Sequence, residues 1–172
     1  ESDPFLQVRA GPAECRTVSV QPPANPMHEH PVKIARLFHW EMGHRLPFHD
    51  GGCANIHGHS YRMWVEVEGI CDENGMLIDY GDLKKAIQPI IDPLDHAFLC
   101  AESDVTMREF LEAQRFKFVL VPFHSTAENI SEYLVENIWS VLEPFSRITG
   151  VSIKLHETDN SYSLAGKSRP PA

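Results

Sequence analysis

The sequence is poor in cysteine and contains no long apolar run. Its cysteines are isolated, with no C-x-x-C pair among Cys15, Cys53, Cys71 and Cys100. Such usage favours free thiols in a reducing compartment over a disulfide framework. No segment approaches the ~20 apolar residues of a membrane span, and no signal peptide is visible. We therefore expect a cytoplasmic protein without a membrane partner.

Basic residues are also scarce. The chain has 15 Lys and Arg residues against 24 Asp and Glu residues, a net charge of −9. This balance argues against nucleic acid as the main partner. With 172 residues, of which 42% are hydrophobic, the chain is long enough to bury one core. Because it opens on Glu1 rather than Met, we expect a preceding piece in the natural chain.

The two ends of the chain differ from its middle. Residues 1–31 contain six prolines and no sustained periodicity, which predicts an irregular N-terminal arm. The chain from Asp159 onward reads as loop, and residues 166–172 predict a frayed C-terminal tail. Residues 32–165 form the expected folded domain.

Apolar alternation predicts the strands, and helical spacing predicts the helices. Strands are expected at Val32 to about Trp40, Ser60–Gly69, Phe116–Val121 and residues 151–155. Helices are expected at Asp82–Ile91, at Asp104–Gln114, and from Ser125, where Ser125-Thr-Ala-Glu128 has a capping-box pattern. This order of elements predicts an α+β fold with helices packed on one face of a sheet.

Three histidines, His44, His57 and His59, fall within sixteen positions. Side chains alternate along a strand, so His57 and His59 point to the same face, with Gly58 leaving room between them. Neutral imidazole suits Zn²⁺, and three protein ligands with one open position are typical of catalytic zinc. An isolated H-x-H pair is common without metal, but the upstream His44 and a nearby cysteine favour a zinc site.

That cysteine is Cys53, four residues before His57. At this spacing it can reach the open position of a metal without being a ligand. A thiolate beside a bound cation has a lowered pKa, which suits a group that abstracts a proton.

Further candidate residues lie in the second half of the chain. Asp95 can orient His96 as a general base, although a histidine after a helix is more often a dipole partner or a surface residue. Glu157 continues the inward parity of residues 151–155, so it either reaches water or binds adjacent N–H donors, such as those of a pterin or guanine. Helix capping explains Thr126 and Glu128, and any ligand role for them is additional.

With these residues in place, the chain resembles the 6-pyruvoyl tetrahydropterin synthase and 6-carboxytetrahydropterin synthase family. The resemblance spans residues 32–165 and lies in the motifs Gly43-His44-Arg45-Leu46, Cys53-Ala-Asn-Ile-His57-Gly-His59-Ser60-Tyr61, Gly75-Met-Leu-Ile-Asp79-Tyr80-Gly81-Asp82-Leu83-Lys84, Leu94-Asp95-His96-Ala-Phe-Leu99, Ser125-Thr-Ala-Glu128-Asn129 and Leu155-His-Glu157-Thr158. The segment from Cys100 to His124 is longer than in compact relatives.

The resemblance implies a tunnelling fold (T-fold), in which a four-stranded antiparallel sheet carries two main helices and subunits close into a barrel as a trimer or hexamer. It implies a zinc ion on His44, His57 and His59. It also implies that Cys53, Asp95 and His96 are catalytic residues and that Glu157 anchors a pterin.

The expected activity is that of a zinc-dependent lyase that converts 7,8-dihydroneopterin triphosphate into 6-carboxy-5,6,7,8-tetrahydropterin, for queuosine and deazapurine biosynthesis. The position of Cys53, four residues before the H-x-H pair, favours this product within the family. One alternative is 6-pyruvoyl tetrahydropterin synthase, which eliminates triphosphate without losing two carbons. Another is a non-catalytic homologue that binds zinc and pterin.

Overall fold

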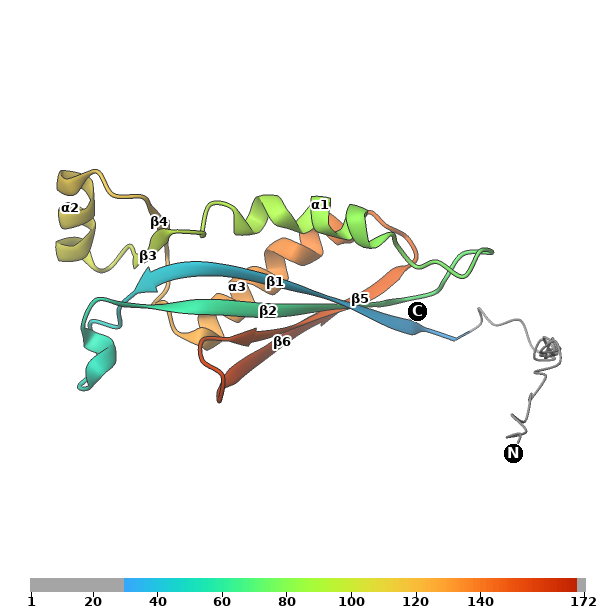
Figure 1. The fold of residues 1–172 in the computed structure, drawn as a ribbon, viewed down its shortest axis with the longest axis horizontal. Coiled ribbons are helices and arrows are strands. Elements are labelled where there is room, and N and C mark those ends of the chain that lie inside the picture. Colours follow the sequence, from blue (N-terminus) through green and yellow to red (C-terminus); the bar gives the residue numbers. More distant parts are fainter. Residues whose placement is uncertain (1–29, 170–172) are drawn as a thin grey trace, which may run out of the picture.

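The computed structural model describes residues 30–169 (Figure 1). The predicted arm, residues 1–31, lies outside the described residues except for its last two positions, and so does the end of the predicted tail. The described chain forms one twisted sheet with helices against it, as expected for an α+β fold.

The sheet has six strands in the order β4-β3-β1-β2-β5-β6, not the four antiparallel strands predicted. Their bounds are Val32–His44 (β1), His57–Gly69 (β2), Ala97–Ala101 (β3), Phe118–Val121 (β4), Ile148–His156 (β5) and Tyr162–Ser168 (β6). The strands on the β4 side of the sheet also differ from the prediction in direction, because β3 pairs in parallel with both β1 and β4.

Strand β6 corrects the prediction of a loop from Asp159 onward. Its sequence gives little sign of a strand, since the inward residues Ser163, Ala165 and Lys167 are small or charged. The strand is held by tertiary pairing, because seven of its residues lie opposite β5 in antiparallel register. Such pairing outweighs weak local propensity.

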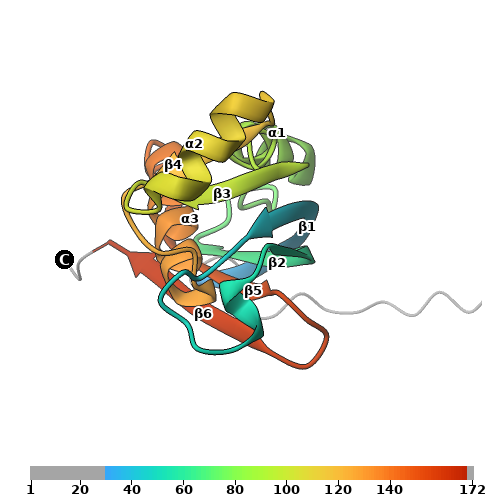
Figure 2. The same cartoon turned by 90° about the vertical axis from the view of Figure 1, so that its left-hand side faces the viewer.

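Residues 30–169 form three α-helices, Tyr80–Ile91 (α1), Val105–Gln114 (α2) and Ala127–Leu142 (α3). Only α1 and α3 cover the central sheet, on one face, whereas α2 lies at one end beside β3 and β4 (Figures 1 and 2). Helices α1 and α3 are the two main helices that the resemblance implies, and α2 is the helix predicted at Asp104–Gln114, within the long segment between Cys100 and His124.

The long hairpin of β1 and β2 positions the candidate site. Both strands run further than predicted, to His44 and from His57, and these two histidines are register partners at the end of the hairpin. Alternate side chains, such as Trp40 and Met63, are buried beneath the helices. The histidines therefore lie where the apolar helix-covered face of the sheet ends.

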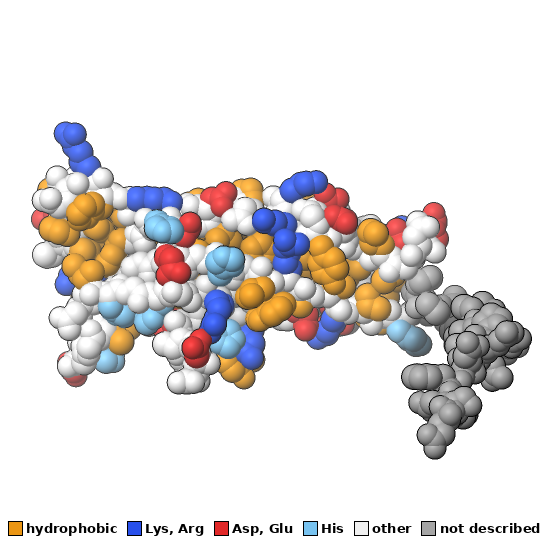
Figure 3. Space-filling model, viewed as in Figure 1, with side chains coloured by type: hydrophobic (Ala, Val, Ile, Leu, Met, Phe, Trp, Pro, Cys, Tyr) orange, Lys and Arg blue, Asp and Glu red, His pale blue; other side chains and the backbone are white. Residues whose placement is uncertain are grey.

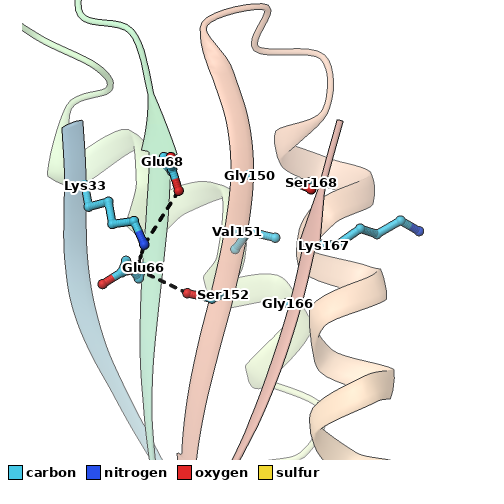
Figure 4. Close-up of a pocket in the computed structure, with 9 residues that line it drawn as sticks. All are labelled: Lys33, Glu66, Glu68, Gly150, Val151, Ser152, Gly166, Lys167 and Ser168. Atoms are coloured by element: carbon cyan, nitrogen blue, oxygen red, sulfur yellow. Dashed lines mark hydrogen bonds and ion pairs between the residues drawn. The ribbon is translucent and has the colours of Figure 1, made fainter. Parts of the chain in front are cut away.

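No helix from the described part of the chain covers the opposite face of the sheet. There Lys33 lies 2.9 Å from a carboxylate oxygen of Glu66 and 3.6 Å from one of Glu68 (Figure 4). These ion pairs border a hollow of about 250 Å³ over Gly150 and Gly166, which contains none of the predicted site residues.

Candidate metal centre and adjoining cavity

The structure brings the three histidines of the predicted zinc site together. One nitrogen from each of His44, His57 and His59 lies within 4.8 Å of the other two. The ring centroids of His44 and His57 are 4.5 Å apart, and those of His57 and His59 are 5.1 Å apart. Histidines gather at this end of the molecule (Figure 3), which Figure 2 views end-on.

Backbone carbonyls orient two of the rings. Nδ1 of His44 lies 2.8 Å from the carbonyl oxygen of Ser125, and Nδ1 of His57 lies 2.8 Å from that of Asn55. A carbonyl oxygen can only accept a hydrogen bond, so each Nδ1 carries the hydrogen and, in the neutral ring, each Nε2 keeps a free lone pair. This is the arrangement that metal-binding histidines commonly have.

His44 supplies a direct test of whether the site suits a metal. Its Nε2 is buried and has no hydrogen-bond partner within the described part of the chain. Burial lowers the pKa of His44, which favours the neutral ring that a metal requires. A buried nitrogen with a free lone pair is costly unless something binds it, so this donor set fits a zinc ion.

A cavity of about 430 Å³ opens beside the histidines. It lies between the end of the hairpin, the start of α3 and the turn from β5 to β6, and it is lined by His44, Leu46, Cys53, His57, His59, Thr126, Ala127, Glu128, Glu157, Thr158, Ser161, Tyr162 and Ser163. Every predicted metal-binding and substrate-binding residue is in this set, together with Cys53.

Cys53 reaches the cavity from a short 3-10 helix, Gly52–Ala54 (η1), in the loop between β1 and β2. The thiol is half-buried, and the carbonyl oxygen of Cys53 accepts a hydrogen bond of 2.7 Å from the amide of Leu46. This bond ties the cysteine to the end of β1, so its position is fixed relative to His44.

The start of α3 differs from the capping-box prediction. Thr126, not Ser125, is the N-cap, and its hydroxyl accepts from the amide of Asn129. Ser125 is instead buried and donates to the carbonyl of Arg45. Ser125 thus contacts the metal site through both its hydroxyl and its carbonyl, which orients the His44 ring. Thr126 and Glu128, at the start of the helix, line the cavity.

Glu157 points into the cavity, as strand parity predicts. Its Oε1 accepts a hydrogen bond of 3.0 Å from the hydroxyl of Tyr61 and lies 3.9 Å from Nε2 of His44. The Glu157 side chain keeps 23% of its surface exposed, so part of the carboxylate is open to a ligand. Burial, reinforced by the Glu157 charge, raises the pKa of Tyr61, which keeps the hydroxyl a donor.

The structure does not bring Asp95 and His96 into this cavity. They form a pair, with Nδ1 of His96 2.9 Å from Oδ1 of Asp95, and a hydrogen bond from the Glu41 amide lowers the pKa of Asp95. His96 is exposed and has a positive φ of 54°. It borders another hollow of about 290 Å³, which is lined by residues of β1 and β2 and shares only His59 with the cavity.

The residues that position the site were not predicted from the sequence. Tyr61 shares the inward face of His57 and His59, and this parity was the available signal for its contact with Glu157. Nothing in the sequence marks the carbonyls of Asn55 and Ser125 as partners of the histidine rings, because any residue has a carbonyl. Their role follows from the path of the backbone alone.

Among the described residues, no helix has the length and apolar character needed to cross a membrane.

Comparisons with known proteins agree on one family. A family model described as 6-pyruvoyl tetrahydropterin synthase matches residues 33–166. The chain is 36% identical over 138 residues to a 6-carboxy-5,6,7,8-tetrahydropterin synthase of Haemophilus influenzae, a match that covers 76% of this chain and 95% of the relative.

Solved structures agree on the fold. A 6-pyruvoyl tetrahydropterin synthase of Plasmodium vivax superposes with a TM-score of 0.68 at 16% identity, covering 82% of this chain and 100% of the other. A Caenorhabditis elegans 6-pyruvoyl tetrahydropterin synthase gives a TM-score of 0.58 at 25% identity, covering 84% and 100%. The chain therefore has the architecture of these proteins.

Proposed function

Because this chain belongs to the 6-pyruvoyl tetrahydropterin synthase family, we propose that it is a lyase that converts 7,8-dihydroneopterin triphosphate into 6-carboxy-5,6,7,8-tetrahydropterin, as in queuosine biosynthesis. Its relative from Haemophilus influenzae carries the name of that synthase. The observation that carries the proposal is a single cavity that holds three histidines suited to zinc, a thiol and a carboxylate.

We propose that His44, His57 and His59 hold the zinc ion. When bound, zinc supplies a Lewis acid that polarises hydroxyl groups of the substrate side chain. The unpartnered Nε2 of His44 and the carbonyl bonds to two of the rings support this assignment.

Of the remaining cavity residues, some bind the substrate and one transfers a proton. Glu157 binds the N–H groups of the pterin, because an ionised carboxylate is an acceptor only. Cys53, fixed beside the end of β1, removes or delivers a proton at the substrate side chain. Thr126 and Glu128 border the same cavity and contact the substrate from the start of α3.

Two unpaired sheet edges support assembly into a barrel. Strand β1 pairs with β3 only at Met42 and Gly43, so its edge from Val32 to about Trp40 has no strand beside it in the described chain. The outer edge of β6 is equally unpaired there. Closing a barrel satisfies both edges, and we propose that β6 of one copy pairs with β1 of the next.

This assembly accounts for the place of the Asp95–His96 pair. Strand β6 runs antiparallel to β1, so its Tyr162 end lies at the same end of the sheet as His44. Pairing β6 of a second copy along β1 brings that copy's cavity towards β3, where His96 is exposed. We propose that His96, oriented by Asp95, acts on substrate held in the neighbouring copy.

The decisive test is turnover of 7,8-dihydroneopterin triphosphate by zinc-loaded protein, with the product identified by mass spectrometry. The proposal expects 6-carboxy-5,6,7,8-tetrahydropterin. A product that retains all side-chain carbons would instead indicate 6-pyruvoyl tetrahydropterin synthase, and binding without turnover would indicate a non-catalytic homologue. The cytoplasmic location stays a prediction from cysteine usage.

A further inference from the structure

The ring of Tyr61 is buried beside the cavity residues and is held in place by the rings around it. It is fully buried, and its ring stacks on that of Trp40 with centroids 5.4 Å apart and planes 8° apart. The rings of His59 and His44 lie edge-on to it, with centroids at 5.7 Å and 6.2 Å. A ring enclosed in this way holds its hydroxyl in one place.

That hydroxyl is the only group in the described chain that donates a hydrogen bond to the Glu157 carboxylate. Glu157 comes directly after β5, where the chain leaves the sheet. Among the described residues, the next polar contact of its carboxylate is the one at 3.9 Å with Nε2 of His44. The orientation of the carboxylate in the cavity therefore depends on Tyr61.

We propose that Tyr61 is a positioning residue that presents Glu157 to the ligand. This inference deepens the proposed function and rests on it, since it takes Glu157 as the group that binds the pterin. By donating to Oε1, the hydroxyl turns the rest of the carboxylate towards the cavity. The site then accepts ligands that offer N–H donors and rejects those that offer acceptors at the same place.

Removing only the hydroxyl tests this role. In Tyr61→Phe the ring still stacks on Trp40, so the fold and the zinc content should match those of the native protein. Binding of 7,8-dihydroneopterin, followed by its fluorescence, should weaken about tenfold, as expected for one lost hydrogen bond to a charged group. In turnover, KM should rise more than kcat falls. Tyr133→Phe is the matched control, because Tyr133 packs against the core without lining the cavity.

A double-mutant cycle with Glu157→Ala separates positioning from a general structural effect. If Tyr61 acts through Glu157, Tyr61→Phe should change ligand affinity little once Glu157 is absent. An equal loss in both backgrounds would overturn the proposal, and so would unchanged affinity in the single variant.

Crystal structures of the native protein and Tyr61→Phe provide a readout that does not depend on the substrate. The carboxylate of Glu157 should turn away from its native orientation in the variant, and an unmoved carboxylate would overturn the inference. Failure of the native protein to bind the pterin would instead count against the proposed function. The comparison of the two crystal structures would still test whether Tyr61 orients the carboxylate of Glu157.

Discussion

The guanidinium of Arg45 is bound by the carboxylate of Asp104 through two hydrogen bonds of 2.6 Å each. Asp104 also caps α2 by accepting from the amide of Met107. Arg45 follows His44 in the chain, and its carbonyl accepts from Ser125, whose own carbonyl orients the His44 ring. The long inserted segment is thus connected to the candidate metal centre by a largely buried ion pair.

Asp104→Asn should destabilise the protein by about 2 kcal/mol. This is less than the ~3–5 kcal/mol for breaking a fully buried pair, because Arg45 keeps part of its surface in water. The free energy of unfolding can be measured in urea. Glu112→Gln, which removes an exposed partner of Arg108 on the same helix, is the control and should cost at most ~0.5 kcal/mol.

The same pair predicts a dependence of stability on pH. Hydrogen bonds from Arg45 lower the pKa of Asp104 in the folded state. The contribution of Asp104 to the free energy of unfolding is therefore complete above the pKa of about 3.9 that the group has in the unfolded chain. It is lost as the pH falls through the lower pKa of Asp104 in the folded protein. Thermal melts below about pH 4 should show a steeper loss of stability for the native protein than for Asp104→Asn. Parallel pH curves would contradict this linkage.

Zinc content should depend on the paired histidines of β2. We expect near-complete loss of zinc in His57→Ala and His59→Ala, because each removes one of three ligands. His39→Ala, an exposed histidine on β1, should retain the metal. Metal analysis by plasma mass spectrometry decides the point, and native zinc content in both β2 variants would refute the assignment.

Cys53→Ala should separate catalysis from metal binding. Turnover should fall by at least ~10²-fold, the usual contribution of a positioned proton-transfer group, while zinc content and melting temperature stay unchanged. Cys71→Ala, a half-buried thiol outside the cavity, is the control. Loss of zinc from Cys53→Ala would make Cys53 a ligand and remove its proposed role.

A site shared between copies should allow complementation. Cys53→Ala and His96→Ala should each be nearly inactive alone. When the two variants are unfolded together and refolded, mixed oligomers contain some sites with both Cys53 and His96 intact, so activity should partly return. If mixing restores nothing although mixed oligomers form, the thiol and the imidazole act within one chain, and the proposed edge pairing of β1 with β6 is wrong.

Several elements follow from local pattern. Alternation in Ser60–Gly69 predicted most of β2, and helical spacing predicted α1, α2 and α3 to within a few residues. Strand parity also placed His57, His59 and Glu157 towards the apolar side of the sheet. These predictions succeed because a side chain's direction repeats with period two in strands and about 3.6 in helices, whatever the rest of the chain does.

Other features depend on contacts between distant segments. Strand β6 and the short β3 have weak patterns of their own and exist through pairing with neighbours. Ser125 does not cap α3 as predicted, because the path of the loop before α3 buries its side chain against the carbonyl of Arg45.

The chemical groups available to this protein can be read from its residues: three imidazoles suited to a metal, a thiol near them and an inward carboxylate. How these groups meet depends on the tertiary fold. The register of β1 against β2 places His44 opposite His57, and Tyr61 and Ser125 orient Glu157 and His44. It also separated His96 from the cavity of its own chain. The physical reason is that donor chemistry belongs to individual side chains, whereas distance and orientation come from backbone pairing between segments far apart in sequence.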